Sequence, residues 1–203
     1  YLIPAVMMII IFQTLLMVIG MVTGEEYSSD GIRTYAPFGH TWAAAIRIVA
    51  GKTFVYCGLY AIFSFFLLGL LPYFFSIPNI GNGLYIVLLM IPYLIATSFL
   101  GLAASRYFTD SEAPLLMIAF FSVGLIFLSG VSYPMELMPW YWKAAHYILP
   151  AAPATLAFVQ LNSMGASMAD IRPEYITLWI QVLVYFILSI WVYQKKLQKS
   201  QLR

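Results

Sequence analysis

The side chains that could carry chemistry are few and lie far apart in this sequence. His40 and His146 are the two histidines, and no second metal ligand stands at a helical spacing from His40. The segments that hold them are expected on opposite sides of a membrane, which argues against a shared catalytic site. The sequence also lacks a GxxxxGK[ST] phosphate loop. It therefore predicts a protein that is not an enzyme, with no catalytic residue, no metal site and no cofactor bound by this chain.

The distribution of charge predicts the class of protein. Only 9% of the 203 residues are charged, whereas 63% are hydrophobic. The uncharged stretches are residues 1–24, 53–105, 113–135 and 175–194. A helix needs only about 20 apolar residues to cross a bilayer, and the continuous apolar runs lack the alternation of a β-barrel. A net charge of +2 gives no dense basic face for nucleic acid. We therefore expect an all-α membrane protein that contacts lipid and has no nucleic-acid partner.

Five membrane spans are predicted within a single transmembrane domain of residues 1–203. They lie at about residues 1–23, 53–72, 84–105, 114–132 and 174–193. The stretch 53–105 holds two spans, because prolines and glycines between residues 72 and 83 break it. An odd number of spans that starts outside suggests at least one more span before residue 1. Small residues inside spans, among them Gly58 and Gly101, are expected where helices approach closely.

Basic residues in the short connections predict the orientation. Two of them, Lys143 and Arg172, fall on one face. Eight share the other face: Arg33, Arg47, Lys52, Arg106, Lys195, Lys196, Lys199 and Arg203. Because short cytoplasmic loops are rich in Lys and Arg, the second face and the C-terminus are expected in the cytoplasm.

The cytoplasmic connection over residues 24–51 is too long and too charged for a simple turn. Pro37 and Gly39 divide it, so a turn or short helix near residues 25–36 is expected, followed by a helix that starts at about Thr41 and enters the second span. From the residues alone, a solvated linker and a segment with a coupling role both remain open.

The outer segment over residues 133–173 is apolar but interrupted. Its prolines are Pro134, Pro139, Pro150 and Pro153. Each removes a backbone donor, so a single straight helix is excluded. We expect one or two broken helices over residues 134–165 that re-enter the outer leaflet. An interfacial helix that lies flat remains the alternative. His146 is expected to cap a helix or to hydrogen-bond locally.

The order of these features resembles the permease subunit of type-2 ATP-binding-cassette (ABC) exporters over essentially the whole chain. The matching motifs are an apolar span, Gly-Glu-Glu with Gly31 shortly after it, three further spans, SGVSYPMELMPWYW, Pro150, LNSMGAS and a last span that ends in basic residues. The resemblance implies that residues 1–203 are spans two to six of a six-span half-transporter in a bacterial inner membrane.

The resemblance also implies site residues and partners. A cytoplasmic coupling helix that contacts the ATPase would contain Glu25, Glu26, Asp30, Gly31 and Arg33. An outer gate or re-entrant element would contain Gly130, Pro134, Glu136, Pro139, Trp140, Pro150 and Gly165. The implied partners are a separate nucleotide-binding subunit that uses ATP, a second permease half that completes a dimer, membrane lipids and, as a further candidate, a periplasmic adaptor.

Two other functions stay open at this point: a structural membrane subunit, and an ATP-independent channel or transporter. An ion-coupled transporter would usually place charged residues inside its spans, and the predicted span interiors contain none. A path lined by Phe, Tyr, Met, Ser and Thr suits an amphipathic or lipid-like cargo for efflux. The exporter resemblance also allows drugs, glycans and peptides, so the substrate is not assigned.

Overall fold

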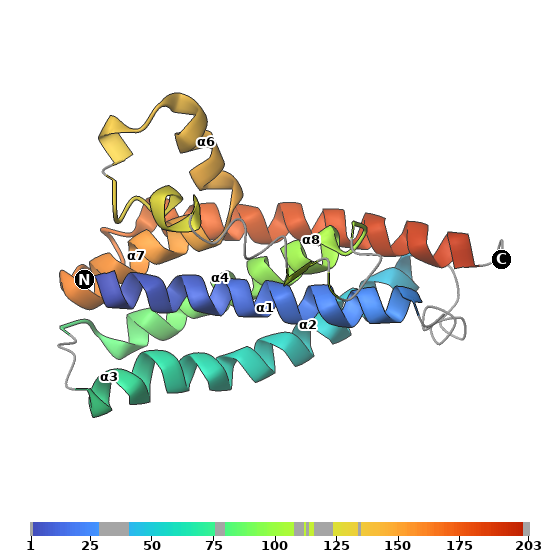
Figure 1. Ribbon diagram of the computed structural model, residues 1–203, viewed down its shortest axis with the longest axis horizontal. Helices are drawn as coiled ribbons and strands as arrows, with labels where there is room; N and C mark the ends of the chain where they lie inside the picture. Colours follow the sequence, from blue (N-terminus) through green and yellow to red (C-terminus); the bar gives the residue numbers. More distant parts are fainter. Residues whose placement is uncertain are drawn as a thin grey trace.

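The chain forms a bundle of long helices that run roughly along one axis (Figure 1). The computed structural model describes residues 2–28, 41–75, 80–107, 112, 114–115, 124–133 and 135–200. These residues form helices, turns and short connections, and no strand occurs among them. The predicted all-α membrane fold is therefore confirmed.

Four continuous helical segments are long and apolar enough to cross a membrane. Their elements are α1 (Leu2–Ser28), α2 (Trp42–Phe65) continued by the π-helix η2 (Phe66–Leu70) and α3 (Leu71–Phe74), α4 (Gly83–Ala104), and α8 (Arg172–Ser200). They overlap the first, second, third and fifth predicted spans. The middle of the fourth predicted span, at residues 116–123, lies outside the described residues, whereas residues 124–128 form a helical turn.

The ends of these helices follow from local chemistry. Thr41 accepts a hydrogen bond from the Ala44 N–H at 3.3 Å, so α2 begins at the position where the sequence predicts a helix start. Asn82 caps α4 in the same way, through the Leu84 N–H at 3.0 Å. Pro72 does not end the second span. It lies in α3, which directly follows the π-helix η2, and a membrane helix tolerates a proline where a local π adjustment accommodates the missing donor, so the helix continues to Phe74.

Helix α4 lies inside the bundle and packs against α1, α2, α7 and α8. Tyr93 is fully buried, and its hydroxyl donates to the Met8 carbonyl of α1 at 2.7 Å. A Cβ atom on Gly101 would lie 3.0 Å from the Ile19 side chain, so the predicted close approach of helices at Gly101 is confirmed. The same prediction for Gly58 is wrong, because a Cβ there would meet no atom within 4 Å.

The outer segment contains two helices joined at a sharp corner. They are α6 (Trp140–Ile148) and α7 (Ala151–Ser163), preceded by the 3₁₀ turn η3 (Met135–Leu137). The axes of α6 and α7 differ by 87°, so the two are either one broken span or a re-entrant loop. Helix α7 is buried within the bundle, whereas α6 projects away from it (Figure 1).

Candidate functional site

Basic side chains gather at one end of the bundle. This end, called the basic end below, is formed by the last turn of α1, the first turns of α2, the end of α4 and the last turns of α8 (right side of Figure 1). The basic residues there whose side chains the structure describes are Arg47, Lys52, Arg106, Lys195 and Lys196. At the opposite end, Lys143 lies on α6 and Arg172 begins α8. The directions of the helices thus place these basic residues at two different ends, in the two groups that the sequence predicts.

A polar cluster links four helices at the basic end. The Lys52 Nζ atom on α2 donates to both carboxylate oxygens of Glu26 on α1, at 2.7 and 2.5 Å, and to the Tyr193 hydroxyl of α8 at 3.2 Å. The Lys196 Nζ atom on α8 donates to the carbonyl and the hydroxyl of Ser105, at 3.1 and 2.9 Å. Ser105 is the C-cap of α4. These five residues are called the four-helix cluster below.

The four-helix cluster is largely shielded from solvent. The Lys52 side chain is 13% exposed and the Glu26 side chain 24%. The Tyr193 ring lies beside both lysines, with Lys52 Nζ at 5.3 Å and Lys196 Nζ at 5.2 Å from its centroid. A buried ion pair is costly to break on one side only, by about 3–5 kcal/mol, because the remaining charge stays buried without its partner. The cluster therefore restrains the ends of α1, α2, α4 and α8 relative to one another.

The predicted coupling residues fall partly in this cluster. Glu25 and Glu26 lie in the last turns of α1, which continues to Ser28, and not in a separate helix. Glu25 is exposed, whereas Glu26 faces Lys52. Asp30, Gly31 and Arg33 lie outside the described residues.

Four members of the cluster are not among the predicted site residues: Lys52, Ser105, Tyr193 and Lys196. The signal that could have found them is their position. Each stands next to the end of a predicted span on the same face, where a charged or hydroxyl side chain can reach across to another helix.

Two glycines of the predicted outer gate have backbone conformations that favour glycine. Gly130 has φ +77° and Gly165 has φ +66°. Pro139 precedes α6 and Pro150 precedes α7, at the positions where these helices begin. Trp140 is 80% exposed at the start of α6. Pro134 and the side chain of Glu136 lie outside the described residues.

Side chains of α8 stabilise the corner between α6 and α7. The Gln181 Nε2 atom donates to the Tyr147 carbonyl at 2.8 Å, and the Tyr185 hydroxyl donates to the Ile148 carbonyl. The last carbonyls of a helix have no donor within the helix, so these contacts satisfy groups that the break exposes. His146 is fully buried and bonds to the Leu128 carbonyl at 2.7 Å, 18 residues away. The expectation that His146 bonds locally is therefore wrong.

The turn that leads into α8 is fixed by Asp170. The Ser167 backbone N–H and hydroxyl both donate to the Asp170 carboxylate at 2.8 Å. These hydrogen bonds hold the pKa of the Asp170 carboxyl below its ordinary value, because they favour the charged form.

The polar side chains of the described residues make structural contacts. Within the described part of the chain, no group of three or more His, Cys, Asp or Glu side chains comes close enough to hold a metal ion. The titratable groups of the four-helix cluster bond to one another and so hold helix ends together.

Comparison with known proteins assigns the family. A family model described as "ABC-2 family transporter protein" matches residues 1–191. A search of curated proteins found no match. The family match covers nearly the whole chain and agrees with its several apolar helices. The chain belongs to the ABC-2 transporter family and is a multi-pass membrane permease, a transport component that is not itself catalytic.

Proposed function

We propose that this permease is the membrane subunit of an ABC-type exporter, forms the translocation path and is driven by a separate ATPase subunit that docks at the basic end. The observation that carries the proposal is the four-helix cluster, which joins α1 to α2, α4 and α8 directly beside the connection between α1 and α2. The ATPase subunit binds and hydrolyses the ATP, and this chain binds no cofactor.

The cluster provides a route for motion. Glu26 lies two residues before the end of α1, and α2 begins at Trp42. A force on the connection between these helices acts first on the end of α1. The Glu26–Lys52 pair passes that force to α2, and Tyr193 passes it on to α8. Closure of two ATPase subunits on ATP would thereby move several helices as a rigid body.

The two glutamates take different roles in this proposal. Exposed Glu25, together with Asp30, Gly31 and Arg33, forms the surface that contacts the ATPase. Half-buried Glu26 transmits the motion. The basic end and the C-terminus are then cytoplasmic, in a bacterial inner membrane. A second permease half completes the path as a dimer, and a periplasmic adaptor is a further candidate partner.

The corner between α6 and α7 is proposed to form the outer gate. It lies beside the middle of α8, whereas the four-helix cluster lies at the last turns of that helix, so α8 contacts both sites: Gln181 and Tyr185 at the corner, Tyr193 and Lys196 at the cluster. A displacement of α8 at the basic end therefore changes the capping of α6.

The test uses the full-length protein purified in lipid nanodiscs with the ATPase encoded beside it. Lys52→Met removes the partner of Glu26. We expect this variant to co-elute with the ATPase and to hydrolyse ATP, but to transport at least about tenfold less per ATP, which corresponds to about 1.4 kcal/mol of lost coupling. The reversed pair Glu26→Lys with Lys52→Glu should recover most of the coupling.

The matched control is Lys195→Met, because Lys195 is exposed on the same helix end and lies over the Trp191 ring, outside the cluster. The Lys195→Met variant should transport as much per ATP as the wild type. Glu25→Lys should instead weaken co-elution with the ATPase. Wild-type coupling in Lys52→Met would contradict the role of the cluster. No association with any ATPase would contradict the exporter proposal and favour a structural subunit or an ATP-independent transporter.

A further inference from the structure

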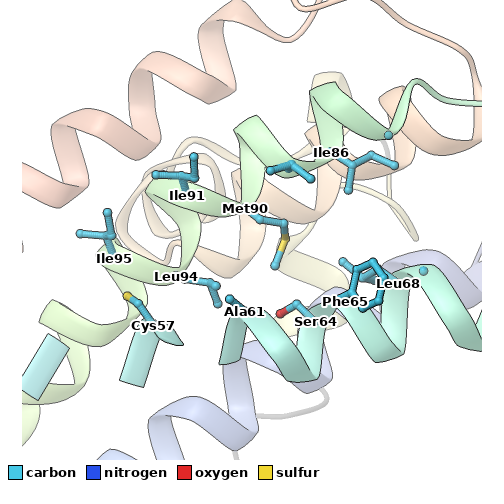
Figure 2. Close-up of a pocket in the computed structure, with 13 residues that line it drawn as sticks. Cys57, Ala61, Ser64, Phe65, Leu68, Ile86, Met90, Ile91, Leu94 and Ile95 are labelled. Atoms are coloured by element: carbon cyan, nitrogen blue, oxygen red, sulfur yellow. The ribbon is translucent and has the colours of Figure 1, made fainter. Parts of the chain in front are cut away.

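An apolar groove of about 600 Å³ runs between α2–η2 and the first half of α4 (Figure 2). The residues of its floor are buried: Leu68, Ile86, Met90 and Leu94. The residues of its rim are exposed: Phe65, Val87 and Ile91. The groove therefore opens toward the outside of the bundle, where a membrane-spanning helix meets lipid.

The dimensions of the groove match an acyl chain. Along α2 and η2 it extends from Cys57 to Gly69, a distance of about 18 Å at 1.5 Å per helical residue. One leaflet of a bilayer is about 15 Å deep in hydrocarbon. The groove, with a volume of about 600 Å³, is therefore about as long as the hydrocarbon of one leaflet is deep.

The groove closes at one end and is widened by small residues at the other. At the narrow end, the Cys57 sulfur lies 3.7 Å from the Ser98 hydroxyl of α4. Toward the other end, a Cβ on Gly83 would meet no atom within 4 Å, and a Cβ on Gly69 would meet only the Phe65 ring, at 3.8 Å. The open end therefore lies where α2 and η2 lead into α3 and where α4 begins.

Water is a poor occupant of this groove. A bound water needs two to four polar partners, and the polar lining side chains are Cys57 and Ser64. Cys57 already contacts Ser98, and Ser64 is buried with no hydrogen-bond partner in the part of the chain that the structure describes. An empty groove would lose the dispersion contacts of its walls. A flexible hydrocarbon chain restores them without requiring a polar partner.

We propose that this groove holds one acyl chain of a bilayer phospholipid, as a resident lipid and not as cargo. The chain belongs to the leaflet at the α6–α7 end and enters between α3 and the start of α4. Residues 53–105 carry no charged side chain, so the two walls of the groove offer no basic group to an anionic headgroup. The lipid is therefore bound through its chain, without preference for headgroup charge. This inference does not depend on the proposed coupling to an ATPase.

The test uses a phosphatidylcholine with a photoreactive diazirine near the end of one acyl chain. The full-length protein is reconstituted with this lipid, transferred to detergent to remove loosely bound lipid, irradiated and mapped by mass spectrometry. We expect adducts on groove residues within 57–69 and 83–95, and few on Phe54 and Leu59, which are exposed on α2 outside the groove lining.

Two variants fill the groove. Ala61→Trp places an indole in its middle, and Gly69→Leu adds a side chain where space is open. Each should lower the groove adducts at least about tenfold, a loss of about 1.4 kcal/mol in lipid binding. The matched control Leu59→Trp adds the same indole to an exposed position of the same helix and should leave the adducts unchanged. All variants should elute in the same way as the wild type, which excludes misfolding as the cause of a loss of adducts.

Three results would overturn the proposal: equal adducts on groove and exposed positions, adducts that persist in Ala61→Trp, or a dimer in native mass spectrometry that Ala61→Trp dissociates. The last result would assign the groove to a second copy. A photoreactive phosphatidylglycerol should give the same groove adducts within about twofold, and a strong preference for this anionic lipid would contradict chain-only binding.

Discussion

At the scale of single residues, Gly81 makes the loop before α4 fit against α7. A Cβ atom built on Gly81 would lie 2.3 Å from the Leu161 carbonyl oxygen and 3.1 Å from the Asn162 Cα atom. Next to it, the Ile80 N–H donates to the Asn162 carbonyl at 3.1 Å. The loop and the end of α7 are therefore joined through backbone atoms at a distance that only glycine allows.

Gly81→Ala should destabilise the protein. The added methyl group meets backbone atoms that cannot rotate away, so we expect a loss of about 1–3 kcal/mol, as for other overpacked sites. For a chain of this size each kcal/mol lowers the thermal midpoint by about 2–4 °C. Circular dichroism of the protein in detergent during heating measures that midpoint.

The control is Gly58→Ala, because Gly58 lies inside α2 and a Cβ there meets nothing within 4 Å. It should leave the midpoint unchanged or raise it, since alanine is the better helix former. A midpoint for Gly81→Ala equal to the wild type would show that the loop can move away from α7.

At the scale of elements, the corner between α6 and α7 depends on α8. Two prolines in the first turn region of α7 stop the chain from continuing as one helix, and α8 supplies donors for the carbonyls that are left. Helix α7 then packs against α1, α4 and α8, while α6 stands outside the bundle. The corner is thus a structural feature maintained by contacts from a helix distant in sequence.

Tyr185→Phe should weaken this corner. Loss of the hydroxyl leaves the Ile148 carbonyl without its donor, at an expected cost of about 1–3 kcal/mol. Limited proteolysis of the nanodisc-embedded protein within residues 140–150 should become faster. Tyr147→Phe is the control, because that ring is half-exposed and its carbonyl, not its hydroxyl, is the group that contacts α8. Equal cleavage rates in both variants would argue against capping by Tyr185.

The sequence predicts the elements better than the contacts between them. Uncharged runs of sufficient length predict the membrane helices, and the prolines predict that the outer segment is broken, because each of these properties is local. Lys52 contacts Glu26 and Tyr193, which lie 26 and 141 residues away in the sequence, and His146 contacts Leu128, 18 residues away. No periodicity of the sequence encodes such pairs. The helix ends also differ from the predicted span boundaries. Helix α1 continues past the apolar residues to Ser28, and α2 begins before them, at Trp42.

At the scale of the whole molecule, the two ends of the bundle differ in charge and in structure. The basic end holds the four-helix cluster, and Lys195 and Arg106 lie over the Trp191 ring there, at 3.8 and 5.4 Å from its centroid. The other end holds α6 and α7. A membrane protein with this asymmetry is expected to insert with the basic end in the cytoplasm.

Labelling of single cysteines tests this orientation. In full-length protein with Cys57→Ala, Lys143→Cys should react with a membrane-impermeant maleimide added outside intact cells, because Lys143 lies on α6. Lys195→Cys, at the basic end, should react only after the cells are permeabilised. The reverse pattern would invert the proposed topology, and with it the side at which the ATPase docks.

The corner at Leu149 and Pro150 makes α6 a short lever. Helix α7 is fixed at its far end by Gly81 and Ile80, whereas α6 is held at its near end by α8 and by the contact of His146. Helix α6 has 9 residues, or about 14 Å of length. A rotation of roughly 4° about the corner therefore displaces its far end, at Trp140, by about 1 Å while α7 stays in place. The break thus separates a projecting helix from a helix packed within the bundle in one short stretch of chain.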